Sequence, residues 1–338
     1  MNRQVIEISW GSLWRVFAFV FFVLILFQAR EVFMGLFLAL VISSGLDPVI
    51  DKLEGLRIPR TLSVIFIFIL FCFGLAIVLY ALVPRLIIDM NSALINLKSQ
   101  PIGRGWLEPF LDITTTQSLT GAIGKISRQV LGGDSSPIGF FTQALGGIAL
   151  VLTIVVSSFY LSLSRDGVER FIRVIFPRDS EERALRLYAR SRKQVAAWFR
   201  TQIFLSIFVG ALVFISTAVL GVQHPLLLAI LAGILEIIPF VGPLVAGGVA
   251  VLIALGQSSS LAFATLLVFV AIQQIEGHLF VPLLMKRSVG LHPVIVIVSL
   301  IIGGQLEGIL GVLIAVPAAA VIQEVIEDWS NSRKLRTE

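Results

Sequence analysis

Carboxylate and amide side chains interrupt otherwise apolar stretches in the second half of the sequence, at Glu236, Gln273, Gln274, Glu276 and Glu307. A charged group near the middle of a bilayer costs at least about 2.5–3.5 kcal/mol, so it has to be paired, protonated or hydrated. A carboxylate in such a setting can bind a cation or exchange a proton. Glu236 is the strongest candidate for this chemistry, because it precedes a proline by about one helical turn.

Structural roles stay open for the other carboxylates. Glu276, followed by His278, could lie near a membrane interface, and Glu307 could lie in a hydrated turn. Catalytic chemistry is not indicated, because the sequence has three histidines, the single cysteine Cys72 and neither an H-E-x-x-H nor a G-x-S-x-G motif. We therefore predict no enzyme activity, no metal site and no cofactor.

Two long apolar runs, 226–255 and 294–322, are each broken near the centre by proline or glycine. Proline removes a helical hydrogen bond and clashes with the preceding turn, so neither run is expected to form one straight helix. We predict two helix–break–helix hairpins. The residues of the breaks, which we add to the predicted pathway, are Pro239, Phe240, Gly242 and Pro243 in the first run and Gly303, Gly304 and Gln305, followed by Gly308, in the second.

Breaks of this kind free backbone N–H and C=O groups, which are tolerated at membrane depth only if they are buried in protein or line an aqueous cavity. Simple packing kinks or turns outside the membrane are the alternative. Each hairpin follows one apolar helix, expected at 204–220 and 261–284. A helix and a hairpin, repeated in opposite orientation, are typical of inverted-repeat secondary transporters, whose sites lie near the midplane where the hairpin tips meet.

The composition requires a membrane environment for these elements. Of the 338 residues, 57% are hydrophobic and 14% are charged, whereas a soluble domain is about one quarter charged. The apolar runs do not alternate with polar residues as strands of a barrel would. The predicted fold is an all-α polytopic membrane protein with spanning helices and two oppositely oriented re-entrant hairpins that form an inverted repeat.

The chain divides by composition into six segments. They are N-terminal transmembrane helices (1–84), an extracytoplasmic polar or amphipathic segment (85–137), a transmembrane helix (138–164), cytoplasmic basic amphipathic helices (165–200), a transport core (201–325) and a cytoplasmic tail (326–338).

The basic residues predict the orientation. Segment 165–200 carries ten Lys or Arg residues against five acidic ones, and short loops rich in Lys and Arg stay in the cytoplasm. With this segment inside, both termini are also cytoplasmic, and 20 of the 26 basic residues lie on that side. Because these residues flank apolar runs, they indicate contact with a bilayer and not with nucleic acid.

Several unusual blocks occur in an order that resembles the autoinducer-2 exporter family of prokaryotic membrane proteins. They are SFYL and RDG at 158–161 and 165–167, LGV at 220–222, GILEIIPFVGP at 233–243, SVGLHP at 288–293, IGG at 302–304, GILG at 308–311 and AVP at 315–317. Departures from the family pattern occur at Phe240, where Tyr is common, at Thr201, at Gly277-His278 and at Lys286.

The resemblance implies export of a small solute, such as an autoinducer-2-like signalling molecule or a related metabolite, across the prokaryotic cytoplasmic membrane. It also implies sodium/proton antiport in some members, and a homo-oligomer such as a pentamer. The expected partners are therefore a small solute, Na⁺ or H⁺, the lipid bilayer and further copies of the chain. A channel or a scaffold that transports nothing is the alternative, because opposed hairpins could also form a fixed pore.

Overall fold

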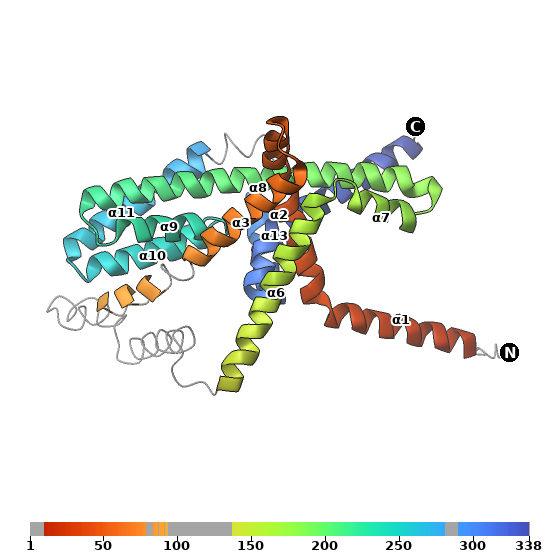
Figure 1. Ribbon diagram of the computed structural model, residues 1–338, viewed down its shortest axis with the longest axis horizontal. Coiled ribbons are helices and arrows are strands. Elements are labelled where there is room, and N and C mark those ends of the chain that lie inside the picture. The colour runs from red at the N-terminus through yellow and green to blue at the C-terminus, as the bar shows by residue number, and fades with distance from the viewer. Residues whose placement is uncertain are drawn as a thin grey trace, which may run out of the picture.

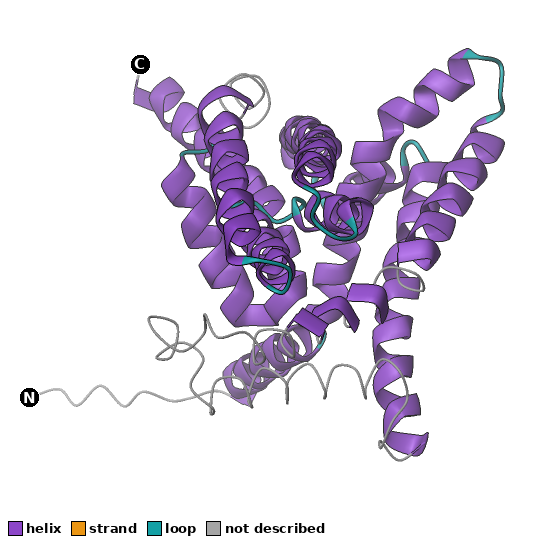
Figure 2. Cartoon of the chain, turned by 90° about the vertical axis from the view of Figure 1, so that its left-hand side faces the viewer, coloured by secondary structure: helices purple, strands orange, loops and turns teal. Residues whose placement is uncertain are grey.

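The computed structural model describes residues 10–78, 84–86, 88–90, 92–93, 137–280 and 290–337. Within these residues all regular elements are helices, as Figures 1 and 2 show. The predicted extracytoplasmic segment 85–137 lies almost entirely outside the described residues. The all-α prediction is thus confirmed for the part of the chain that the structure describes.

The N-terminal part contains α1 (Trp10–Gln28), α2 (Arg30–Gly55) and α3 (Arg60–Ile77), and α6 (Pro137–Leu163) packs against α2 and α3. A turn at Ala29 separates α1 from α2. Helix α1 projects away from the other helices (Figure 1), and aromatic side chains on it such as Trp10, Trp14 and Phe19 are exposed. Helix α2 runs through Pro48 without a break and forms the centre of this part.

Helix α7 (Gly167–Ile175) follows α6 after a short turn, and the described parts of these two helices meet at 89°. Helix α8 (Arg178–Leu220) then runs for 43 residues. The sequence pattern predicted basic cytoplasmic helices up to residue 200 and a separate apolar helix from 204. The structure instead has one continuous helix, because α8 contains no proline and its polar and apolar halves both have helix-compatible residues.

The first broken run forms α9 (Pro225–Leu235) and α10 (Val241–Leu255), two helices that pack against each other and against neighbouring helices. Helix α11 (Ser259–Ile275) follows and continues into a short π-helix (Glu276–Phe280). A cluster of buried residues from α8, α9, α10 and α11 holds these helices together, with Val213, Leu228 and Ala250 almost fully buried.

The second broken run lies in α13 (Pro293–Thr337), which is interrupted at Glu307 (φ −144°, ψ 24°) and Gly308 (φ 55°, ψ −130°). The backbones of Gly303 and Gly311 touch, and a Cβ on Gly303 would lie 3.2 Å from the Cβ of Ala315. Residues eight apart in a straight helix are about 12 Å apart along the axis. The chain therefore reverses at Glu307–Gly308, and α13 consists of two arms that pack against each other.

Four of the described helices are long and apolar enough to cross a membrane, and the bent pair α6–α7 would add a fifth. Two further clusters of buried residues hold the molecule together. One joins α2, α8 and α13 around Val41, Trp198 and Ala320, and the other joins α2, α3 and α6 around Ile50 and Val64.

Candidate functional site

The turn between α9 and α10 places Glu236 inside the protein. Helix α9 ends at Leu235, and Phe240, with φ 64°, turns the chain into α10. A Cβ on Gly242 would overlap the carbonyl oxygen of Leu235 and would lie 2.9 Å from the amide nitrogen of Glu236. Gly242 and Pro243 are buried, so the proline- and glycine-rich sequence of the turn lets the backbone pass close to the end of α9.

The Glu236 side chain is 1% exposed, and apart from the carboxyl group of Glu276 neither carboxylate oxygen has a hydrogen-bond partner among the described residues. The backbone carbonyl of Glu236 accepts a hydrogen bond from Nε2 of Gln202 on α8. The described surroundings also leave Oε1 of Gln202 and Oγ of Ser206 unpaired, and both residues are buried. Three buried residues on two packed helices thus present unpaired oxygen atoms.

Glu276 adds a second carboxyl group to this site. It begins the π-helix after α11, is partly buried and interacts with the neighbouring Glu236. Gln273 donates a hydrogen bond from Nε2 to Oε2 of Glu276 over 2.8 Å. Gln274 is exposed, and its backbone carbonyl lies 3.2 Å from Nδ1 of His278. The structure therefore brings together Glu236, Gln273 and Glu276, and Gln274 faces away.

The second turn has a different partner. Glu307 forms an ion pair with Arg30 at the start of α2, and the Glu307 side chain is 7% exposed. The guanidinium of Arg30 also lies over the ring of Phe27, 4.5 Å from its centroid. Gly303 and Gly304 lie half-buried in the first arm of α13, and Gln305 is exposed. These predicted pathway residues thus group around the Arg30–Glu307 pair.

The turn between α9 and α10 and helix α13 share one cluster of packed side chains, which does not include the turn at Glu307. Ile238, in the turn between α9 and α10, packs against the cluster of α2, α8 and α13, which includes Leu300 and Ala315. The turn with Glu236 therefore lies against the cluster that α2, α8 and α13 share, and the turn with Glu307 lies against α2. A direct approach of the two tips remains a prediction.

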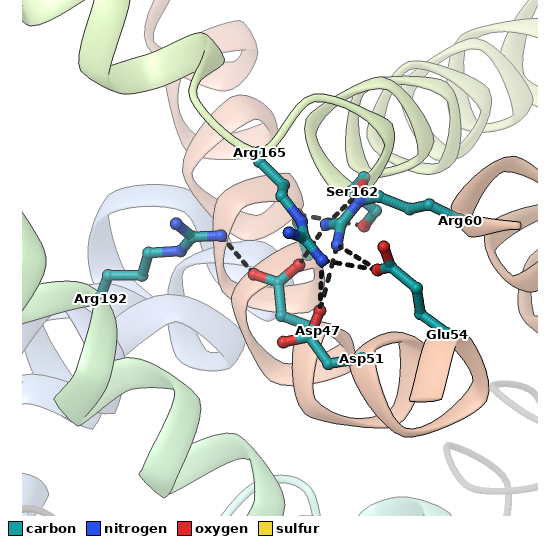
Figure 3. Close-up of polar contacts among 8 residues, drawn as sticks. Asp47, Asp51, Glu54, Arg60, Ser162, Arg165 and Arg192 are labelled. Carbon is teal, nitrogen blue, oxygen red and sulfur yellow. Dashed lines mark hydrogen bonds and ion pairs between the residues drawn. The ribbon is translucent and has the colours of Figure 1, made fainter. Parts of the chain in front are cut away.

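An ion network joins four helices near the loops that follow α2 and α6 (Figure 3). Arg60 on α3 donates to Ser162 O over 2.7 Å and contacts Asp47 at 3.1 Å and Asp51 at 3.2 Å. Two further pairs complete the network, Arg165 with Glu54 at 2.6 Å and Arg192 on α8 with Asp47. Three arginines and three carboxylates neutralise one another, so the network is suited to holding helices together.

A second polar cluster ties α8 to the end of α13. Glu324, which is 4% exposed, contacts Arg190 at 3.0 Å and accepts from Gln194 at 2.5 Å. Asp328 contacts Arg190 at 2.6 Å and Arg183 at 2.7 Å. In the described part of the chain, no group of three or more His, Cys, Asp or Glu residues is arranged to hold a metal ion.

Sequence reasoning missed Gln202, Arg30 and the ion network. Gln202 lies where the basic half of α8 becomes apolar, and it was not among the candidates because it lies at a segment boundary. Arg30 lies in a short polar stretch between two apolar runs, and nothing near it indicates a partner. A usable signal existed for the network, because Asp47, Asp51 and Glu54 recur at helical spacing and so lie on one face of α2.

Comparisons with known proteins agree on one class of protein. A family profile described as "AI-2E family transporter" matches residues 16–331. YrrI of Bacillus subtilis, named as a transport protein, is 27% identical over 94% of this chain and 89% of its own length. YueF of the same organism, also named as a transport protein, is 28% identical over 86% of this chain and 82% of its own length. PerM of Escherichia coli, named as a permease, is 27% identical over 61% of this chain and 60% of its own length.

Proposed function

The chain belongs to the AI-2E transporter family, and on that premise we propose that it is a secondary transporter. It exports a small solute, such as an autoinducer-2-like signalling molecule or a related metabolite, across the cytoplasmic membrane. Its several apolar helices support a multi-pass membrane protein.

The observation that carries the proposal is the environment of Glu236. Its side chain is buried, and the only polar side chain found beside its two carboxylate oxygens among the described residues is the second carboxyl group, Glu276. An ionised carboxylate is very unfavourable in such a place, so the group needs a proton or a bound cation. A group that gains or loses H⁺ or Na⁺ inside a transporter can couple the ion gradient to movement of the solute.

The broken helices support a place for the solute beside this carboxyl group. The turn at 236–240 interrupts the apolar run between α9 and α10, and interrupted helices of this kind are typical of transporter sites. In the proposed mechanism the two hairpins form an inverted repeat, and their turns open opposite sides of the membrane in alternation. The Arg30–Glu307 pair would then hold the second turn closed.

A cation antiporter is the second candidate, and the neighbouring carboxyl groups of Glu236 and Glu276 favour it. Two carboxyl groups at close range repel each other when both are ionised, and a bound cation or one shared proton removes this repulsion. In that case the ions would themselves be the substrates, with no organic solute.

The test is a counterflow assay in proteoliposomes with a labelled furanone-type signal, run with and without Na⁺ and H⁺ gradients. A carrier exchanges label against unlabelled solute, and a channel only dissipates the gradient. We expect Glu236→Gln to lower the gradient-driven transport rate at least tenfold. The amide keeps the shape of the carboxyl group but cannot bind a proton or a cation in the same way. Glu182→Gln, at a residue whose side chain is 84% exposed, is the matched control.

Three results would contradict the proposal. Wild-type rates and ion dependence in Glu236→Gln would reduce the residue to a structural role. Dissipation without counterflow would indicate a channel. Exchange of Na⁺ for H⁺ without any effect of the furanone would support the antiporter.

A further inference from the structure

A cavity of about 410 Å³ lies between α2, α7, α8 and α13, within the range of roughly 300–1,000 Å³ that is usual for ligand pockets. Its wall is almost entirely apolar and includes Phe37, Ile172, Leu187 and Val321. Polar side chains also line it, among them Arg183. Arg183 is already paired with Asp328 at 2.7 Å, so the cavity itself offers an apolar interior and a free cation must come from residues beside it.

Helix α7 covers one side of the cavity and has an unusual surface. Ile172 and Phe176 line the cavity, whereas Phe171, Val174 and Ile175 are 65%, 85% and 56% exposed. Basic residues share the exposed surface of this helix. Exposed apolar side chains beside arginines are typical of helices that lie in the headgroup region of a membrane.

Acidic residues outside segment 165–200 pair with several of its arginines, among them Asp328 with Arg183 and Arg190. Arg173 is paired with Glu181 at 3.1 Å, but in the described part of the chain no ion pair involves Arg170 or Arg178, which are both exposed. One unpaired cation therefore lies on the helix whose inner face lines the cavity, and a second follows that helix.

We propose that this cavity binds one acyl chain of an anionic phospholipid. The chain occupies the apolar interior, and the phosphate lies at the turn between α7 and α8, near Arg178. Arginine donates several N–H groups to a phosphate, and each basic residue near an anionic lipid surface strengthens binding by about fivefold. This site is independent of Glu236 and of the transported solute.

A lipid explains the features better than a second protein chain. Lipid surrounds every membrane protein and reaches exposed side chains such as Val174 without a dedicated partner surface. The positive charge selects an anionic headgroup, and the narrow apolar interior fits a hydrocarbon chain. A helix from another chain would need acidic residues at the cavity mouth and would also have to displace the side chains of α7.

The test measures binding by the purified full-length protein in a mild detergent. Phosphatidylglycerol, phosphatidylcholine with the same acyl chains, and free glycerol phosphate are titrated, and bound lipid is counted by native mass spectrometry while the unfolding temperature is recorded. We expect saturable binding of about one phosphatidylglycerol per chain, at least fivefold tighter than phosphatidylcholine, and no effect of glycerol phosphate.

Two pairs of variants test the two ends of the site. Ala184→Trp fills the cavity, since Ala184 lines it, and should abolish the phosphatidylglycerol-specific effect. Val219→Trp on the same helix, at a residue 82% exposed, should keep it. Arg178→Gln should weaken phosphatidylglycerol binding about fivefold, and Arg186→Gln, which breaks an exposed pair with Glu182, should weaken it less.

Equal binding of the two phospholipids, or unchanged preference in both Ala184→Trp and Arg178→Gln, would overturn the proposal and leave a non-specific apolar surface. An effect of glycerol phosphate alone would indicate a phosphate site without an acyl chain, which also contradicts it. If Ala184→Trp does not fold, the Arg178→Gln result decides, because that exposed residue is not part of the packed interior.

Discussion

Gly242 offers a sharp test of the turn that places Glu236. In Gly242→Ala the added Cβ would overlap the Leu235 carbonyl oxygen and would lie 2.9 Å from the Glu236 nitrogen. Both atoms belong to the backbone, so the clash cannot be relieved by rotating a side chain. Overpacking of a well-packed site typically costs about 1–3 kcal/mol, and we expect a value at the upper end of this range because the turn itself has to open.

Gly248→Ala is the matched control, because Gly248 lies in the same helix, α10, and a Cβ there would have no neighbour within 4 Å. Alanine is favoured over glycine inside a helix by roughly 0.5–1 kcal/mol, so this variant should be as stable as the wild type or slightly more stable. The two variants add the same methyl group, and the difference between them should be about 2–4 kcal/mol.

The assay is unfolding of the purified protein in mixed micelles, by titration with dodecyl sulfate and by thermal unfolding, together with the counterflow rate. Gly242→Ala should unfold at a lower dodecyl sulfate fraction and should transport more slowly, because the Glu236 backbone moves. Equal stability of Gly242→Ala and Gly248→Ala would refute the close packing of the turn against the end of α9.

Two further predictions concern ion pairs. Arg30→Gln leaves the nearly buried Glu307 carboxylate unpaired and should lower the free energy of unfolding by about 1–3 kcal/mol. This loss is smaller than for a fully buried pair because Arg30 is 42% exposed. The double exchange of Arg30→Glu with Glu307→Arg should recover at least half of the lost stability in the same dodecyl sulfate titration. Arg60→Lys should cost about 1–3 kcal/mol, because one ammonium cannot reach Asp47 and the Ser162 carbonyl together as the guanidinium does, and wild-type stability would contradict this.

Much of the helical architecture could be predicted, because long apolar runs and prolines act locally. The sequence pattern predicted α6 within a residue at each end, and it predicted an interruption at Pro239–Pro243 and another near Gly308. The continuity of α8 was not predicted. Composition changes sharply near Arg200, but a change from polar to apolar residues alters the surroundings of a helix and does not stop it.

The candidate site was predictable only in part. Glu236 and Glu276 stand out because carboxylates are rare in apolar segments. Their meeting depends on how α9 and α11 both pack against α8, and this is a tertiary arrangement that no local pattern encodes. Glu307 shows the same limit, since Arg30 lies 277 positions earlier in the sequence and nothing near either residue indicates the other.

The length of α8 has a mechanical consequence. A helix of 43 residues is about 64 Å long, roughly twice the hydrocarbon thickness of a bilayer. Gly45 lets α2 cross it closely at Phe199, with one ring carbon 2.8 Å from the position of a Cβ on Gly45. Phe199 is the middle residue of the helix.

Helix α8 therefore has two halves of equal length, one on either side of its crossing with α2. The half before Phe199 carries Arg183, Arg190 and Arg192, which bind acidic residues of α13 and α2, and the half after it carries Val209 and Val213, which pack in the cluster with α9 and α11. A tilt of about 5° at the crossing would displace each end by roughly 3 Å in opposite directions. A change in charge at the basic end thus has a rigid path to the packing of α8 against α9 and α11, with no further hinge needed along the way.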